Sequence, residues 1–305
     1  MEESKEVLKS WVALAGKWKF DRDSAQYLGP EKNSPFPHGI ALTRSRFRSG
    51  SIKTTVHFFE NPQESVGRII FGYNPETKEY FSFGLGGYDF AYVLDEFLPG
   101  KGWRAFAAAG NKDNFSPNCD TQIEVKIYGQ KGSLIVDGIK VLEGNLPRPV
   151  TGDQIGLFAW GPALVEFKNT FALASNPKAF VIMEFQEPYE SLYSEVIKNV
   201  ATEMDLEIYK ANEIYKPGII LQDITREIIE AEVIIAEITP ANANVFYELG
   251  YAHAIGKPTI LLAQKGENKL PFDISGYRCI FYDDTIRGKK DVEDQLRKHL
   301  ASILG

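Results

Sequence analysis

Glu248 is the residue of this sequence with the clearest potential for chemistry. The sequence predicts a helix from about Val245 to Ile255, and Gly256 ends it. We expect Glu248 in or just after the first turn, where free N–H groups and the helix dipole favour an ionised carboxylate. A helix that follows a parallel strand begins at the edge of the sheet where open α/β folds bind ligands. A catalytic carboxylate is one interpretation, and an ordinary glutamate that only favours the helix dipole is the other.

Two buried strands and a polar loop must position this helix. The apolar runs Val233–Ile238 and Thr259–Ala263 predict strands buried on both faces, and Pro240 ends the first one. Asn242 and Asn244 are both suited to cap the helix, since an amide oxygen accepts a bond from a free backbone N–H. At 100° per residue, one stripe of the helix packs on the sheet and Glu248 lies at its border. The stripe consists of Val245, Leu249, Ala252 and Gly256.

Strands and helices alternate through the rest of the second half, which predicts a flavodoxin-like parallel sheet with right-handed crossovers. The expected strands are Ala179–Met183, Glu207–Lys210 and Arg278–Tyr282, and the expected helices are Tyr189–Met204, Ile220–Ala231 and Lys289–Leu304. Glu184 and Phe185 follow the first strand, so we expect them at the same sheet edge as Glu248.

Four stretches carry a resemblance to known families: FVIMEF, YKPGIILQDI, AEVIIAEIT and NVFYELGYAHAIGKPTILL. Over roughly Lys178 to Asp284 the chain resembles the nucleoside 2-deoxyribosyltransferase superfamily and TIR-like NAD hydrolases. The resemblance implies that Glu248 is the catalytic carboxylate, which attacks or stabilises the anomeric carbon of a sugar. The substrate-binding residues that we expect are Met183, Glu184, Phe185, Glu237, Asn242, Asn244 and Tyr247.

Two of these residues bear on the choice of substrate. Deoxyribosyltransferases have an aspartate six residues before the nucleophile, where this chain has Asn242. An acid there would protonate a leaving purine or pyrimidine, whereas nicotinamide leaves NAD⁺ as a neutral base without a proton. Phe185 and Tyr247 could line a slot for a flat base, although Tyr247 points away from the sheet on the helical wheel.

The resemblance therefore favours an NAD⁺ glycohydrolase, with NAD⁺ as substrate and no cofactor; such proteins often act in bacterial antiviral defence. One alternative is a nucleoside 2-deoxyribosyltransferase or nucleotide N-glycosidase. Another is a non-catalytic TIR-like scaffold that associates with itself. In the TIR family the loop of Pro217, Gly218, Ile219 and Ile220 leads to assembly contacts, which predicts a homo-oligomer. Alternatively, the two isoleucines only cap the next helix.

The first half has a different composition, because all four tryptophans lie within residues 1–160. Short alternating segments separated by Gly, Pro, Asn and Asp predict an antiparallel β-sandwich or jelly roll. The expected strands are Ser51–Phe59, Gly67–Gly72, Tyr80–Leu85, Ala91–Leu94, Thr121–Tyr128, Ser133–Val136, Ile139–Leu142 and Gln154–Trp160. We expect one domain over residues 1–174 and a second over 175–305, with Thr170–Lys178 as a short linker.

The segments GSLIVDGIKVLEG and TGDQIGLFAWGPALVEFKN give residues 11–171 a resemblance to laminin-G-like and concanavalin-like jelly rolls. The resemblance implies a sensor or binding module for an unknown activating ligand, and secreted relatives often bind glycans on the concave face. Aromatic core packing is the alternative. The candidates for that face are Tyr73, Tyr88, Tyr92, Trp103 and Arg104. Asp95 and Glu96 would alternate faces of a strand, which makes them a poor glycosidase pair.

Composition excludes several classes of function. The formal net charge is −7 with no basic run, which argues against nucleic-acid binding. No signal peptide or run of ~18 apolar residues is present, so we expect no membrane partner. Two distant cysteines, Cys119 and Cys279, suit a reduced, cytoplasmic protein. No histidine stands at metal-site spacing, and we expect no metal.

Overall fold

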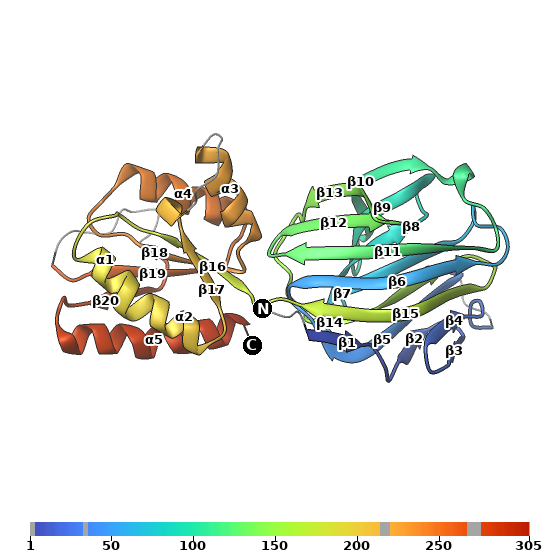
Figure 1. The fold of residues 1–305 in the computed structure, drawn as a ribbon, viewed down its shortest axis with the longest axis horizontal. Coiled ribbons are helices and arrows are strands. Elements are labelled where there is room, and N and C mark those ends of the chain that lie inside the picture. Colours follow the sequence, from blue (N-terminus) through green and yellow to red (C-terminus); the bar gives the residue numbers. More distant parts are fainter. Residues whose placement is uncertain (1–3, 33–35, 214–219, 267–275, 305) are drawn as a thin grey trace. The chain divides into compact units, whose positions relative to one another are not determined.

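The computed structural model describes residues 4–32, 36–213, 220–266 and 276–304. Its contacts divide the chain into two compact units, drawn in Figure 1. The first unit is Met1–Ile127 with Lys131–Ser175, and the second is Tyr128–Gln130 with Asn176–Gly305. Each unit is built on its own sheets, so each is described by itself below.

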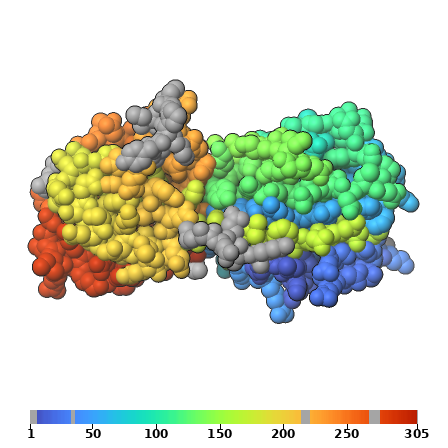
Figure 2. Space-filling model, in the orientation of Figure 1, coloured from blue at the N-terminus to red at the C-terminus, as the bar shows by residue number. Residues whose placement is uncertain are grey.

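The first unit is an antiparallel sandwich, and its eight-stranded sheet has the order β13-β12-β11-β6-β15-β4-β3, with β1 also paired to β15. Figure 2 shows the outer face of this sheet as a continuous surface of side chains. Its strands are β1 (Ser4–Val7), β3 (Trp18–Phe20), β4 (Ser24–Tyr27), β6 (Gly50–Phe58), β11 (Cys119–Tyr128), β12 (Lys131–Val136), β13 (Ile139–Asn145) and β15 (Val165–Ala174).

The seven-stranded sheet has the order β10-β9-β8-β7-β14-β5-β2. Its strands are β2 (Val12–Ala15), β5 (His38–Arg46), β7 (Val66–Tyr73), β8 (Tyr80–Leu85), β9 (Phe90–Leu98), β10 (Gly102–Asn111) and β14 (Gln154–Trp160). A short 3-10 turn, η1 (Lys112–Asn114), follows β10. Because side chains alternate along a strand, this sheet has two different faces. Ile69 and Phe71 face the core between the sheets, whereas Ile70 belongs to a second apolar cluster on the opposite face.

The sandwich is larger than the sequence pattern predicts. β8 and β14 have the expected bounds, but β1 to β5 and β10 were not predicted as strands. Some of them lack a period of two: β2 has three exposed residues in a row, and β10 is irregular in its burial. The expected linker Thr170–Lys178 is also wrong in its bounds. β15 continues to Ala174 and the next strand begins at Lys178.

The second unit has a five-stranded parallel sheet of order β17-β16-β18-β19-β20, the order of a doubly wound α/β fold. Its strands are β16 (Lys178–Ile182), β17 (Glu207–Lys210), β18 (Val233–Glu237), β19 (Thr259–Gln264) and β20 (Cys279–Tyr282). Its helices are α1 (Tyr189–Leu192), a π-helical stretch η2 (Tyr193–Ile197), α2 (Lys198–Glu203), the turn η3 (Ala211–Glu213), α3 (Ile220–Glu230), α4 (Ala243–Ala254) and α5 (Ile286–Leu304).

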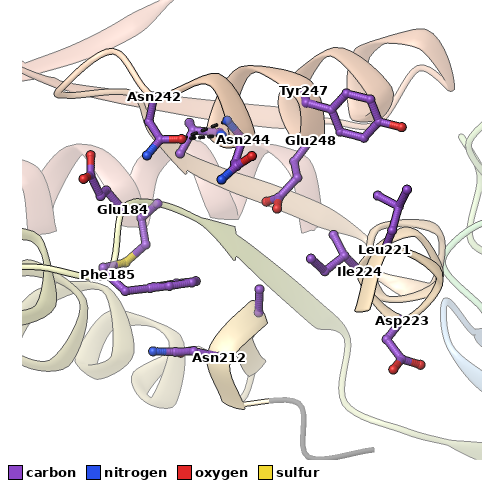
Figure 3. Close-up of a pocket in the computed structure, with 13 residues that line it drawn as sticks. Glu184, Phe185, Asn212, Leu221, Asp223, Ile224, Asn242, Asn244, Tyr247 and Glu248 are labelled. Atoms are coloured by element: carbon purple, nitrogen blue, oxygen red, sulfur yellow. Dashed lines mark hydrogen bonds between the residues drawn. The ribbon is translucent and has the colours of Figure 1, made fainter. Parts of the chain in front are cut away.

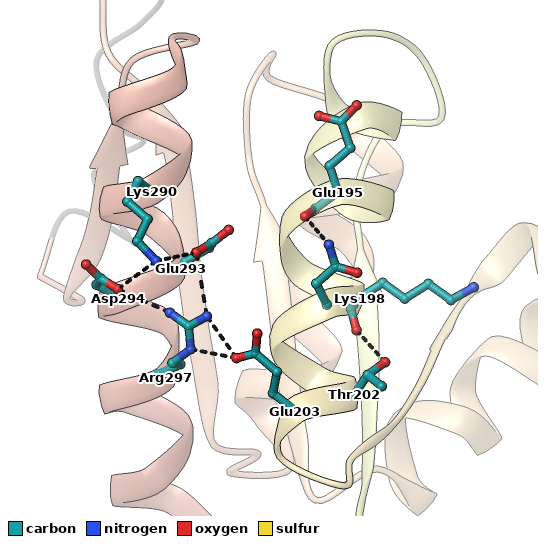
Figure 4. Close-up of polar contacts among 9 residues, drawn as sticks. Glu195, Lys198, Thr202, Glu203, Lys290, Glu293, Asp294 and Arg297 are labelled. Carbon is teal, nitrogen blue, oxygen red and sulfur yellow. Dashed lines mark hydrogen bonds and ion pairs between the residues drawn. The ribbon is translucent and has the colours of Figure 1, made fainter.

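Helices cover both faces of the parallel sheet (Figure 1). Val196 and Leu296 pack α1–α2 and α5 against one face, and Ile228 and Leu249 pack α3 and α4 against the other. On the surface, Arg297 of α5 pairs with Glu203 of α2 and with carboxylates of its own helix (Figure 4). Such exposed pairs contribute about 1 kcal/mol or less, so the apolar faces hold the helices in place.

Within the described part of the chain, no helix combines the length and the apolar character needed to cross a membrane.

Candidate functional site

A cavity of about 670 Å³ opens at the carboxyl edge of the parallel sheet (Figure 3). Its volume lies within the roughly 300–1,000 Å³ that small-molecule sites commonly have. The lining residues are Met183, Glu184, Phe185, Ala211, Asn212, Leu221, Asp223, Ile224, Asn242, Asn244, Val245, Tyr247 and Glu248. Seven of the eight residues predicted for catalysis or substrate binding therefore lie together.

The doubly wound topology explains how these segments meet. Met183 and Glu184 directly follow β16, and Asn212 follows β17. Asn242 and Asn244 come after β18, at the start of α4. Parallel neighbouring strands deliver all of these loops to one sheet edge. Figure 3 shows Asn244 and Glu248 projecting from α4 into the cavity, opposite Phe185 and Asn212.

The two asparagines have different roles in the structure. Asn242 is the N-cap of α4, and its side-chain oxygen accepts hydrogen bonds from the backbone N–H of Asn244 at 2.8 Å and of Val245 at 3.4 Å. Asn244 lies inside the first turn and is not a cap. Its amide group faces the cavity beside Glu248 (Figure 3), where it can donate or accept hydrogen bonds.

The predicted charge of Glu248 needs correction, and so does the predicted start of its helix. Glu248 lies in the second turn of α4, because the helix begins at Ala243, earlier than expected. The free N–H groups of the first turn are therefore too distant to stabilise its charge. Burial raises the pKa of the Glu248 carboxyl to about 7. The group is consequently divided between its acid and its ionised form near neutral pH, rather than fully ionised.

No described residue donates a hydrogen bond to this carboxylate, and burial alone accounts for the raised pKa. The predicted packing of α4 is otherwise correct: Val245, Leu249 and Ala252 are buried. Gly256 follows the helix end and is exposed, so it does not extend the packed stripe. Glu248 thus lies beside the buried stripe with its carboxylate directed into the cavity.

Two aromatic side chains lie at the cavity and reach solvent. Phe185 is 45% exposed and Tyr247 is 62% exposed. Tyr247 points away from the sheet, as the helical wheel predicts, yet it still lines the cavity (Figure 3). Exposed aromatic rings at a cavity are suited to stack on a flat ligand.

Glu237 is the predicted substrate-binding residue that does not line the cavity. It is only 1% exposed, and its Oε1 accepts a hydrogen bond from the backbone N–H of Thr239 at 2.9 Å. Along β18 it shares a face with Val233 and Ile235, the face that α5 covers. Burial raises the pKa of its carboxyl to about 8. Glu237 is therefore a buried acid on the sheet face that α5 covers. Its position near a strand end did not reveal to which face of the sheet its side chain points.

Several lining residues were not predicted. Asn212 follows the carboxyl end of β17, so the rule that identified Glu184 would also have found it. Leu221, Asp223 and Ile224 come from α3, whose approach to α4 is a tertiary contact without a sequence signal. Of the predicted assembly loop, Pro217, Gly218 and Ile219 and the side chain of Ile220 lie outside the described residues, so that role stays a prediction.

A second cavity, of about 510 Å³, lies on the seven-stranded sheet, on the face that carries the second apolar cluster. Tyr88 and Trp103 line it, as does the buried carboxylate of Asp95. The other expected concave-face residues have different positions. Tyr73 is buried and Tyr92 packs against the main core, while Arg104 pairs with Glu96.

No group of described His, Cys, Asp or Glu side chains is arranged to hold a metal ion.

The chain matches no protein family model, and no curated protein matches it. Among solved structures, a carbohydrate-binding module, CBM66, from Bacillus subtilis is 14% identical with a TM-score of 0.45, over 53% of this chain and 94% of that chain. A Bacillus licheniformis β-glucanase is 12% identical with a TM-score of 0.39, over 57% of this chain and 98% of that one. A prokaryotic β-1,3-1,4-glucanase from a mouse hindgut metagenome is 13% identical with a TM-score of 0.39, over 56% of this chain and 98% of that one. The sandwich assignment rests on the strand pairing described above.

Proposed function

We propose that the second unit cleaves an N-glycosidic bond with Glu248 as the catalytic carboxylate, and that NAD⁺ is its substrate. The observation that carries the proposal is the position of Glu248. A half-buried carboxylate without a described hydrogen-bond donor or cation faces a cavity with aromatic and amide groups at its walls. An unneutralised carboxylate is suited to meet positive charge that develops during a reaction.

The proposed reaction proceeds through an oxocarbenium-like state at the anomeric carbon of the ribose. As the bond to nicotinamide breaks, its electron pair returns to the pyridinium nitrogen, which becomes neutral, so no acid is needed. Ionised Glu248 stabilises the sugar cation or forms a bond to the anomeric carbon. Water then adds at that carbon and releases a proton together with ADP-ribose. Phe185 and Tyr247 would stack on the flat base, and Asn244 would bond a sugar hydroxyl.

The test is to incubate the full chain with NAD⁺ and to follow nicotinamide release by chromatography. We expect release that depends on enzyme amount. The assay is run over two decades of protein concentration, because assembly is also expected. Folded protein that releases no nicotinamide at any concentration contradicts the NAD⁺ proposal.

One observation favours a second candidate, the cleavage or transfer of an uncharged nucleoside. Glu184 and Glu248 line the cavity, as does Asp223, which pairs with Arg226, whereas none of the lining residues that the structure describes is a lysine or arginine. A pyrophosphate would meet carboxylates there, and a nucleoside without phosphate would not. Deoxynucleosides incubated with a free base distinguish the two candidates, since base exchange or base release without any action on NAD⁺ would select the second.

A further inference from the structure

A buried lysine lies next to the Glu248 cavity and has no part in the reaction proposed above. Lys210 ends β17 and is only 6% exposed, and the two residues that follow it, Ala211 and Asn212, line the cavity. Lysine is almost never fully buried unless it is paired. The contacts of its ammonium group therefore indicate what this side chain does.

The ammonium group of Lys210 has a carboxylate and two aromatic rings as neighbours. Its Nζ donates a hydrogen bond to Oε2 of Glu190 in α1. It also lies 4.5 Å from the centre of the Tyr193 ring and 5.8 Å from the centre of the Phe185 ring. A cation over the face of an aromatic ring is attracted by the negative charge of that face, more strongly when the pair is shielded from water.

These neighbours connect three segments of the chain. Tyr193 is 2% exposed and belongs to the core beneath α1–α2. The backbone N–H of Glu190 donates to the carbonyl oxygen of Gln186 at 3.1 Å, and Gln186 directly follows Phe185. Lys210 thus joins the end of β17 both to the first helix and to the loop that carries Phe185.

Phe185 is the neighbour of Lys210 that reaches the cavity. It lies between β16 and α1, is 45% exposed, and lines the cavity opposite Glu248 (Figure 3). Exposed side chains commonly change rotamer within nanoseconds, so a ring in a loop needs a contact that holds it. Lys210 does not line the cavity, so its ammonium group contacts the ring from the buried side. The side of the ring that faces the cavity stays free for a ligand.

We propose that Lys210 is a positioning residue, which holds the ring of Phe185 as a flat wall of the cavity. Its contact with the ring fixes Phe185, and its ion pair with Glu190 fixes the ammonium group. A ring that is already fixed loses less conformational freedom when a ligand binds, so the stacking is stronger. The proposal rests on the proposed function only where it concerns NAD⁺, whose flat base would stack on Phe185.

The first test follows the Phe185 ring without any ligand. Relaxation of ¹³C in ring-labelled phenylalanine gives an order parameter for each ring, and Phe185→Leu identifies the signal of this ring by its loss. We expect the order parameter to fall in Lys210→Met, and to fall less in Glu190→Gln, which keeps the ammonium group but removes its counter-ion. Lys198→Met, at an exposed lysine of α2 (Figure 4), is the matched control and should leave the order parameter unchanged.

The second test uses nicotinamide release from NAD⁺. A stacked base is bound equally before and during bond cleavage, so weaker stacking raises KM and leaves kcat nearly unchanged. We expect Lys210→Met to raise KM at least about fivefold, with kcat within about threefold of the parent. In a Phe185→Leu background the same change should not raise KM further, because the contact is already lost. A variant that is only partly folded would lower kcat instead and keep KM.

Circular dichroism identifies the variants that remain folded. Glu190→Gln is the safer of the two, because the Glu190 side chain is 30% exposed and already reaches water. An unchanged order parameter of Phe185 in folded Lys210→Met, or in Glu190→Gln where only that variant folds, would overturn the proposal. So would an unchanged KM in folded Lys210→Met. Parent protein that releases no nicotinamide contradicts the reaction proposed for Glu248, whereas the order parameter still decides the role of Lys210.

Discussion

Glu248 and Asp95 are carboxylates that face cavities in the two units, and their surroundings differ in one respect. Asp95 accepts hydrogen bonds from Ser82 and Tyr88 and is neutralised by Arg68. Glu248 has no such partner among the described residues, and burial raises its pKa to about 7. A carboxylate whose bonds are complete gains nothing from a developing cation. An unpartnered one does, which supports our proposal of a catalytic role for Glu248, whereas the bonds of Asp95 give it a structural role.

Replacing Glu248 should have the largest effect on activity. Glu248→Gln keeps the shape of the side chain and removes the negative charge, so we expect nicotinamide release to fall at least about a thousandfold while the fold is retained. The rate of nicotinamide release at saturating NAD⁺ measures this loss of activity. The matched control is Glu195→Gln, at a side chain that is 63% exposed on the helix surface, which should keep parental activity. Activity of Glu248→Gln within tenfold of the parent would exclude this residue as the catalytic carboxylate.

Asp95→Asn should act on stability instead. It leaves Arg68 buried without its counter-ion, and breaking a buried ion pair by removing one partner costs about 3–5 kcal/mol. All four tryptophans lie within residues 1–160, so tryptophan fluorescence during urea unfolding reports on the sandwich. We expect a lower midpoint for Asp95→Asn. Asp21→Asn, at an exposed surface pair with Lys19, is the control. An unchanged midpoint would mean that the pair does not hold this cavity together.

The pH dependence of activity should show a smaller effect. Only ionised Glu248 can stabilise a cation, and its pKa is about 7. Activity should therefore rise with pH and level off above neutrality, and it should be lower by roughly a hundredfold at pH 5. Initial rates of nicotinamide release between pH 5 and 9, with circular dichroism to confirm folding, measure the profile. A profile that is flat between pH 5 and 7 would contradict a carboxylate with this pKa.

Sequence alone predicts much of the second unit, because periodic patterns are local. The expected strand Glu207–Lys210 has the observed bounds, and the topology of the sheet follows from strand–helix alternation. The same rule brings Glu184 and Asn244 to the edge that holds Glu248. The prediction for Glu237 was wrong, because the rule gives the sheet edge but not the face of β18 from which a side chain projects.

The remaining features depend on contacts between distant segments. Asn242 and Asn244 are equally good caps by residue type, and only the helix start selects between them. The raised pKa of Glu248 follows from its burial in the folded cavity, to which α3 contributes side chains from another part of the chain. Arg68 and Asp95 meet because β7, β8 and β9 pair in a particular register. No local pattern in the sequence encodes that register.

The pairing of β1 with β15 has a consequence for synthesis. Val7 lies opposite Phe171, so the first strand of the sandwich gains this partner only when nearly the whole unit has left the ribosome. At about 5–20 residues per second, that wait lasts roughly 10–30 s. Contacts between such distant segments also slow folding itself. During this interval the early strands expose apolar surface, which favours aggregation of the nascent chain.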